Sequence, residues 1–483
     1  MSPAPDDLLA TRRGGIAAGL GITALFLALR IPLLRGREPF FDELFTRWLA
    51  AQPFGAILRA LRLDSGPPLY YFLAHIIFAV HDSIIAARVL SLTCVLGTLV
   101  LILAAQSLGR IRYLAAALLA VYPPFVLFSV DARSYALCAL FIAIAVVALE
   151  RWSADAEPVP GRPLNPWLLA ATGALVAAAY SHYYGALFLP LPAALGLIES
   201  PAGRRRVAGI AATLVAGVLF LPGIALALRQ PPQATAWFGE QETSPFAALA
   251  ALGFAADYPR ALFAPAPALL VAFALVLLIA SIARTASSPR AIRFAVMTLT
   301  PVAVAMAMQL TVRQVWFPMR FEAVIAPPLA IWIAAALDGW RRPLRIAIAG
   351  GILLTGLGAS WNGIIDHYRR PLDPYRQIAI EARRTLDPRS PIVASGYLWL
   401  EVVSQRDASW HPPVIAFPAE QAAHPGWRPA PSLDALLRER TALPSPPFVW
   451  IGELNTNEMK AILTGRSGTA LFANGRAGAM LVK

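Results

Sequence analysis

The sequence predicts an α-helical polytopic membrane protein that ends in a small soluble α/β domain. Of the 483 residues, 58% are hydrophobic and only 14% are charged, and the mean hydropathy is +0.60. These values exclude an ordinary soluble domain. After Trp361 the long apolar runs give way to shorter runs of strand length. We therefore expect a membrane domain at residues 1–360 and a soluble α/β domain at residues 361–483.

The first element is an apolar run from Gly15 to Leu34, whose roughly twenty residues are long enough to span a bilayer as a helix. Arg12 and Arg13 precede it, so the positive-inside rule places the N-terminus in the cytoplasm. No small-x-small cleavage site follows, which predicts a retained anchor. The first loop, residues 35–85, is then extracytoplasmic. Arg30 is expected to extend towards the interface from this span.

The segment from Pro67 to Val80 is too short to cross a bilayer unaided, so we expect an interfacial helix. With that assignment the five arginine clusters between later apolar runs all lie on the cytoplasmic side. Arginines that flank membrane spans also explain the net charge of +13, so no nucleic-acid partner is expected. The clusters are Arg110 and Arg112, Arg151 and Arg162, Arg204 to Arg206, Arg284 to Arg293, and Arg341 to Arg345. The eleven predicted spans lie near 15–34, 86–105, 112–129, 134–150, 166–180, 184–199, 207–228, 266–283, 293–312, 319–337 and 343–360.

Polar and aromatic side chains gather in the loops that this topology places outside, whereas the middles of the spans carry almost no ionisable residue. Chemistry at one membrane surface is therefore favoured over an ion relay through the bilayer. The candidate site residues are Asp42, Glu43, Asp64, Tyr70, Tyr71 and His75 in the first loop, Asp131, Arg133 and Tyr135 in the second, His182 and Tyr183 in the third, and Arg320 before a late span.

The C-terminal domain alternates short apolar runs with helical patterns. The runs PIVASGYLWL and PPFVWIGEL predict strands, and residues 375–386 and 433–440 predict helices. The glycine-rich stretch GRSGTALFANGRAG near the end predicts a hairpin and turns, and no phosphate cradle. The proline-rich residues 412–446 are expected to form an irregular loop.

Five motifs follow one another along the chain: the acidic pair Asp42-Glu43, the Pro-Pro-Leu-Tyr-Tyr run from Pro67 to Tyr71, the turn with Asp131, Arg133 and Tyr135, the turn with Tyr180, His182 and Tyr183, and the pair Arg320-Phe321. Their order resembles that of the C-fold glycosyltransferases that use polyprenyl-phosphate sugars, a group with the protein O-mannosyltransferases and the lipid A aminoarabinose transferase. One difference is Gly66, because that group often has His before the Pro-Pro pair.

The resemblance implies the C-type glycosyltransferase fold in a bacterial inner (plasma) membrane. The predicted topology places the active site and the C-terminal domain on the extracytoplasmic side. Nucleotide sugars are absent there, so the expected partners are a polyprenyl-phosphate-linked sugar donor, a lipid, glycan or protein acceptor, and membrane lipids. A carboxylate would act as the general base and arginines would stabilise the leaving phosphate. We assign Asp42 as the base, with Glu43 as a helper or as the ligand of a divalent metal ion, the only cofactor considered. Inversion at the anomeric carbon is expected.

Each candidate residue also has an interpretation in which its role is purely structural. Asp42 and Glu43 also suit the first turn of a helix, where carboxylates are stabilised. Arg133 and Arg320 also suit membrane-interface anchors. A turn explains Asp64, interfacial packing explains the aromatic residues of the first loop, and His182 also suits an ordinary interfacial histidine. The rival functions are a transporter or lipid flippase without transferase activity, and a non-catalytic membrane subunit.

Overall fold

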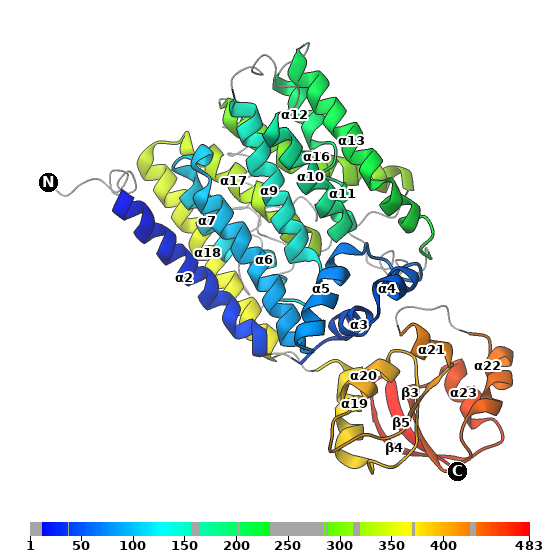
Figure 1. The fold of residues 1–483 in the computed structure, drawn as a ribbon. Helices are drawn as coiled ribbons and strands as arrows, with labels where there is room; N and C mark the ends of the chain where they lie inside the picture. Colours follow the sequence, from blue (N-terminus) through cyan, green and yellow to red (C-terminus); the bar gives the residue numbers. More distant parts are fainter. Residues whose placement is uncertain are drawn as a thin grey trace. The chain divides into compact units, whose positions relative to one another are not determined.

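The computed structural model (Figure 1) shows two compact units, which we call the helical unit and the mixed unit. The helical unit comprises Met1–Arg37, Gly66–Leu228 and Phe238–Arg369. The mixed unit comprises Glu38–Ser65, Arg229–Trp237 and Arg370–Lys483, so it joins part of the first loop to the C-terminal domain. The structure describes residues 12–36, 38–155, 165–199, 203–231, 285, 288–312, 319–369, 372–425 and 431–483.

The helical unit is built from apolar helices. The described helices are α2 (Arg12–Arg35), α5 (Leu69–Val80), α6 (Ile84–Ala104), the short 3-10 helix η1 (Gln106–Leu108), α7 (Ile111–Val121), α8 (Pro123–Leu127), α9 (Tyr135–Ala154), α10 (Pro166–Ser181), α11 (Tyr183–Ala186), α12 (Leu191–Glu199), α13 (Arg204–Ala227), α16 (Pro289–Val312), α17 (Met319–Asp338) and α18 (Arg342–Arg369).

Seven helices in the described part of the chain are long and apolar enough to cross a membrane, so the chain is an integral membrane protein. The described part of the chain does not show all eleven predicted spans. The predicted span at 266–283 lies outside the described residues, and the predicted spans at 112–129, 166–180 and 184–199 form shorter helices. The seven are α2, α6, α9, α13, α16, α17 and a segment that begins with α18.

The predicted span at 112–129 is interrupted because two prolines follow Tyr122. Proline lacks an N–H and disfavours helical geometry in the residue before it, and Tyr122 is accordingly extended, with ψ of 113°. The helix therefore ends at Val121 as α7 and restarts at Pro123 as α8.

Arg30 lies inside the bundle and does not extend to the interface, which corrects the prediction from the sequence. Its side chain is fully buried and its guanidinium donates to the carbonyls of Ala120 (2.9 Å) and Phe125 (3.3 Å). Carbonyls beside a helix end lack the partner that the next helical turn would supply. Arg30 therefore satisfies backbone acceptors at the break between α7 and α8.

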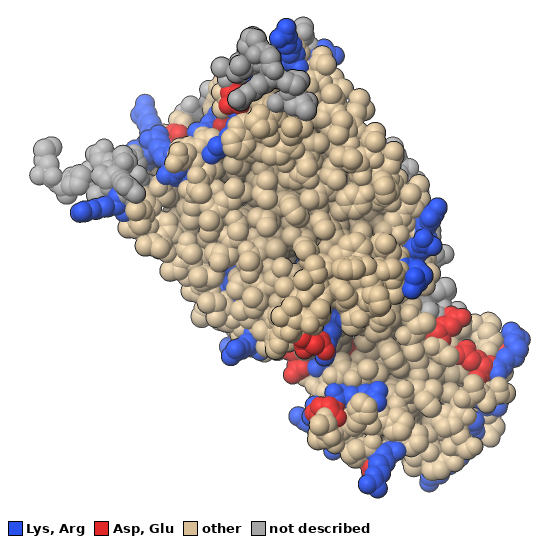
Figure 2. Space-filling view, viewed as in Figure 1, with Lys and Arg blue, Asp and Glu red and all other residues tan. Residues whose placement is uncertain are grey.

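Burial separates central helices from peripheral ones. In the most apolar stretch of each helix, 89% of the residues are buried in α17 and 78% in α9. Only 22% are buried in α2 and in α13. The exposed face of α13 is apolar, with Val207, Leu214 and Val218 more than half exposed. Figure 2 shows a surface that is mostly tan across the middle of these helices, with Lys and Arg at their ends. This pattern is typical of helices that face lipid.

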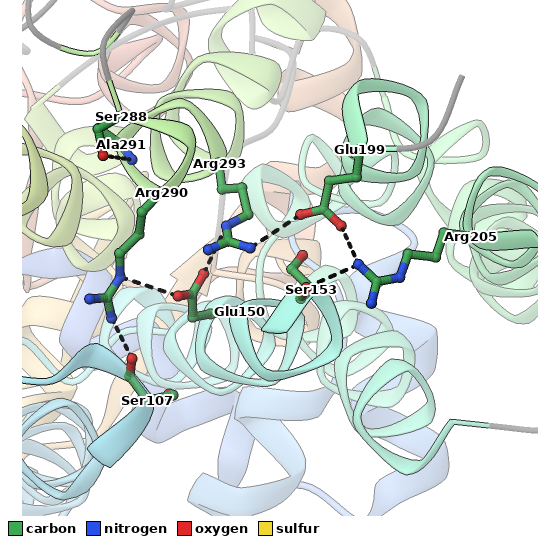
Figure 3. Close-up of polar contacts among 9 residues, drawn as sticks. All are labelled: Ser107, Glu150, Ser153, Glu199, Arg205, Ser288, Arg290, Ala291 and Arg293. Carbon is green, nitrogen blue, oxygen red and sulfur yellow. Dashed lines mark hydrogen bonds and ion pairs between the residues drawn. The ribbon is translucent and has the colours of Figure 1, made fainter. Parts of the chain in front are cut away.

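Ion pairs link the helix ends at one end of the bundle (Figure 3). Glu150 of α9 pairs with Arg290 (3.3 Å) and Arg293 (3.4 Å) of α16. Arg293 continues to Glu199 of α12 (3.6 Å), and Glu199 to Arg205 of α13 (3.4 Å). A second group joins Asp338 of α17 to Arg110 (2.8 Å) and Arg345 (3.3 Å). These contacts gather residues from, or next to, all five arginine clusters.

The candidate residues of the later loops lie at the other ends of the same helices. Tyr135 begins α9 and Glu150 lies near its end, about 22 Å further along the helix axis. Arg320 lies in the first turn of α17 and Asp338 ends it, about 27 Å away. The two sets of side chains are thus separated by nearly the thickness of a hydrocarbon core. Their assignment to outside and inside stays a prediction.

The mixed unit contains a five-stranded sheet in the order β2-β1-β3-β5-β4, in which β1 is parallel to β2 and β3, and the other pairs are antiparallel. Helices pack on both faces, with α19 and α20 residues in one core and α22 and α23 residues in the other. The elements are α3 (Phe41–Ala50), α4 (Phe54–Leu61), α19 (Pro374–Thr385), β1 (Ile392–Ser395), α20 (Leu398–Ser404), β2 (Val414–Phe417), α21 (Glu420–Ala423), α22 (Leu433–Glu439), the 3-10 helix η3 (Arg440–Ala442), β3 (Phe448–Glu453), α23 (Asn457–Leu463), β4 (Gly468–Asn474) and β5 (Ala477–Val482).

Most predicted elements of this unit are present. β1 and β3 occupy the two predicted strand runs, although the second half of the first run forms α20, and β4 and β5 form the predicted hairpin, with Gly475 at φ +60° in its turn. The expectation of an irregular loop at 412–446 is wrong, since β2 lies there. The prolines flank β2, and its Phe417 is buried in the core.

Candidate active site

The acidic pair occupies the first turn of α3, and the helix gives its two members different environments. Phe40 precedes the helix in an extended conformation and supplies no side-chain cap. Both carboxylates lie in the first turn, where the helix dipole favours negative charge. Glu43 is fully buried with Leu44 and Phe45, whereas Asp42 is only partly buried. Of the two, Asp42 is the carboxylate accessible from solvent.

Asp42 and Asp64 lie near one tyrosine of the C-terminal domain. Burial raises the pKa of Tyr397, and the negative charges of Glu453, Asp42 and Asp64 raise it further. Tyr397 also contacts Phe41 edge to face, with ring centroids 4.6 Å apart. The mixed unit therefore brings together three carboxylates from distant parts of the chain.

Tyr397 and Glu453 were missed by sequence reasoning. Tyr397 follows β1 by two residues and Glu453 ends β3, so both lie at the carboxyl ends of adjacent parallel strands. In open α/β sheets that edge commonly carries functional side chains. The hydroxyl of Tyr375 donates to Glu453 (2.7 Å) and holds its carboxylate. Strand-end position was the signal available, but the pairing of β1 with β3 was not readable from the sequence.

A second group of candidates forms a cluster of aromatic and basic side chains in the helical unit. Arg133 donates to the hydroxyl of Tyr71 (3.4 Å), and Arg320 donates to the hydroxyl of Tyr135 (3.4 Å). The ring of His182 lies 5.1 Å from that of Tyr135. Two partly exposed arginines are thus surrounded by several elements, namely α5, α9, α17 and the turns before α9 and α11.

His182 is neutral in this cluster. Burial and, to a smaller extent, the positive charges of Arg133 and Arg320 together lower its pKa to about 3. Its Nδ1 accepts the backbone N–H of Tyr184 (3.1 Å), so in the neutral ring the proton is on Nε2. The cluster therefore concentrates positive charge and hydrogen-bond donors, which is the chemistry that recognises a phosphate.

The remaining candidates take different positions. Asp131 is buried, and its backbone carbonyl accepts from Ser91 (2.7 Å) and from the N–H of Arg133 (2.6 Å), which fixes the turn. Tyr70 is buried beside Tyr71, with rings 6.0 Å apart. His75 and Tyr183 are partly buried on α5 and α11. Within the Tyr-x-His-Tyr turn, Tyr180 has a structural role, donating to the carbonyl of Leu219 on α13 (3.0 Å).

A metal site does not emerge from the residues that the structure describes. Among them, no three His, Cys, Asp or Glu side chains are grouped so that they could hold a metal ion. Glu43 is fully buried. A metal site with three protein ligands is thus not found among the described residues, and Glu43 as a metal ligand stays a prediction.

The polytopic bundle joined to a mixed sheet has the fold of the C-type glycosyltransferases, proteins that use lipid-linked sugar donors. The likeness is one of structure, because no protein-family model and no curated protein sequence matches the chain.

The similar solved structures include ArnT from Cupriavidus metallidurans bound to undecaprenyl phosphate. That match has a TM-score of 0.59 at 12% identity and covers 96% of this chain and 97% of that one. The apo state of the same ArnT matches with a TM-score of 0.57 at 13% identity, over 96% of each chain. The arabinofuranosyltransferase AftD from Mycobacteria matches with a TM-score of 0.52 at 15% identity, over 98% of this chain and 40% of that one.

Proposed function

We propose that this protein transfers one sugar from a polyprenyl-phosphate donor to a lipid, glycan or protein acceptor at the extracytoplasmic side of the bacterial inner membrane. The observation that carries the proposal is the cluster of Arg133, Arg320 and neutral His182 at one end of an apolar helix bundle with a transferase fold. A lipid-linked donor has a phosphate next to a long hydrocarbon chain. A site for such a donor needs cationic groups for the phosphate and a lipid-facing helix bundle beside the hydrocarbon chain. The helical unit has both.

The structural likeness supports the choice of donor. The ArnT crystal structure contains undecaprenyl phosphate, a polyprenyl phosphate. By analogy, we assign the phosphate of the donor to the two arginines of the helical unit. Arg320 donates to Tyr135 and Arg133 to Tyr71 at 3.4 Å, distances that leave room for shorter charge-assisted bonds to a phosphate.

The reaction then follows from charge. Asp42 accepts the proton of the acceptor hydroxyl as that oxygen bonds to the anomeric carbon. The bond from the anomeric carbon to the phosphate oxygen breaks, and its electron pair leaves on the phosphate. The singly charged diester becomes a more highly charged monoester, so fixed arginines stabilise the transition state more than the bound donor. A single displacement inverts the anomeric configuration.

The accessible member of the acidic pair suits the base. A general base has to reach a substrate hydroxyl, which the partly exposed Asp42 can do and the fully buried Glu43 cannot. Glu43 as a metal ligand stays a prediction, and loss of transfer on chelation with restoration by Mg²⁺ or Mn²⁺ would support it.

The test is Asp42→Asn, which keeps the size of the side chain and removes its basicity. Transfer from a labelled undecaprenyl-phosphate hexose or pentose should fall by about two to four orders of magnitude, while binding of undecaprenyl phosphate is unchanged. Asp407→Asn is the control, because Asp407 is an exposed carboxylate of the same unit that pairs with Arg383. Retention of more than about a tenth of wild-type turnover by Asp42→Asn would exclude Asp42 as the base.

A further inference from the structure

One arginine of the C-terminal domain fixes the segment that leads into the Asp42 helix. Arg376 lies on α19, and its side chain is only 8% exposed. It donates to Glu401 (3.3 Å) and Ser404 (2.7 Å), both on α20, and to Glu38 (2.6 Å), four residues before Asp42. The two α20 partners hold the guanidinium in place whether or not Glu38 is bound.

Aromatic contacts continue this attachment along α3. Phe41, next to Asp42, lies against Tyr397 (ring centroids 4.6 Å apart). One turn later the ring of Phe45 contacts the ring of the buried His424, with centroids 5.6 Å apart. Such edge-to-face contacts stabilise the packing beyond the area that they bury. α3 is therefore held by the C-terminal domain on the side of its first turn and further along its length.

The pair between Arg376 and Glu38 differs from the one between Arg376 and Glu401. Glu401 is 2% exposed, so removing one partner of that pair would leave a buried charge and disrupt the fold. The Glu38 side chain is 49% exposed and Arg376 keeps its pair with Glu401, so loss of the Glu38 charge changes stability little. What changes is the freedom of the chain just before α3, because the ion pair of Glu38 ties that segment to Arg376 of α19.

We propose that Arg376 and Glu38 are positioning residues that hold Asp42 in its reactive geometry, which makes the C-terminal domain part of the catalytic apparatus. This inference rests on the proposed function. A general base acts only within hydrogen-bond distance of the proton that it removes, and displacement by about 1 Å can lower the rate about a hundredfold. Glu38 is four residues from Asp42, so the anchor limits displacement of the base.

The experiment compares Glu38→Gln with Asp407→Asn in the full-length protein. The Arg383–Asp407 pair is the matched control, because its side chains are 40% and 41% exposed in the same unit and it does not involve α3. With undecaprenyl phosphate carrying a labelled hexose or pentose, we expect Glu38→Gln to lower kcat about tenfold or more and to change the donor KM by less than about twofold. Glu38→Asp, which keeps the charge, should recover part of kcat.

Hydrogen exchange supplies a readout that does not depend on activity. Peptides covering α3 should exchange faster in Glu38→Gln than in the wild type, whereas Asp407→Asn should leave their exchange unchanged. Unchanged α3 exchange, or a kcat in Glu38→Gln equal to that of Asp407→Asn, would overturn the proposal. Absence of transfer by the wild-type protein would instead overturn the proposed function, so the two failures are distinguishable.

Discussion

The ion-pair network around Glu150 offers a quantitative test of how the helix bundle is held together. Glu150→Gln keeps the shape of the side chain and removes the charge that neutralises Arg290 and Arg293 (Figure 3). Glu150 is 3% exposed, and removing one member of a buried pair typically destabilises by about 3–5 kcal/mol. The two arginines are 31% and 21% exposed, so solvent offsets part of the loss. We expect about 2–3 kcal/mol.

The assay is hydrogen exchange of the purified protein in micelles, read on peptides from the end of α9 and the start of α16. A loss of about 2 kcal/mol corresponds to roughly thirtyfold faster exchange where local opening controls it. Asp338→Asn is the matched control. It also removes a carboxylate that pairs with two arginines, but Asp338 is 34% exposed and Arg110 56%. Its effect should stay within about 0–1 kcal/mol.

The reasoning depends on burial, so the contrast between the two variants decides it. Equal effects of Glu150→Gln and Asp338→Asn would show that exposure does not determine the strength of these pairs. An effect of Glu150→Gln below about 1 kcal/mol would show that the network does not hold α9 against α16.

Three further predictions concern topology, the donor phosphate and pH. Reporter fusions should place residue 110 in the cytoplasm and residue 131 outside, and a cytoplasmic report at 131 would remove the proposed active surface. Arg320→Lys should lower turnover more than the affinity for undecaprenyl phosphate, because a point charge remains but the bidentate fork is lost; turnover near that of the wild type would leave Arg320 an interfacial anchor. Burial raises the pKa of Glu401 to about 7, so the folded protein binds a proton there more tightly than the unfolded chain does. Its contribution to stability is then largest below about pH 4.5 and is lost as the pH rises towards 7, so the thermal unfolding temperature should fall over that pH range, and an unfolding temperature that does not fall would contradict the reasoning.

The sequence determined the elements whose cause is local. An apolar run of about twenty residues forms a spanning helix whatever its neighbours are, and α2, α6 and α13 lie where the runs predict them. The short run after Pro68 forms α5 with twelve residues, and the glycine-rich end forms the hairpin β4–β5. The break at Tyr122 was also local, since two prolines cause it, but a count of apolar residues does not register a missing N–H.

Only the tertiary structure decided which side chains meet. Arg30 was expected at the interface because it lies near the end of an apolar run in the sequence. In the structure its N–H groups donate to carbonyls about ninety residues away. Asp42 was assigned as the base over Glu43 from the sequence, but the physical reason for that choice, the burial of Glu43, came from the structure. Tyr397, Glu453 and Arg376 became candidates only when the order of the strands was known. Contacts between residues distant in the chain depend on the packing of whole elements, and local periodicity carries no record of that packing.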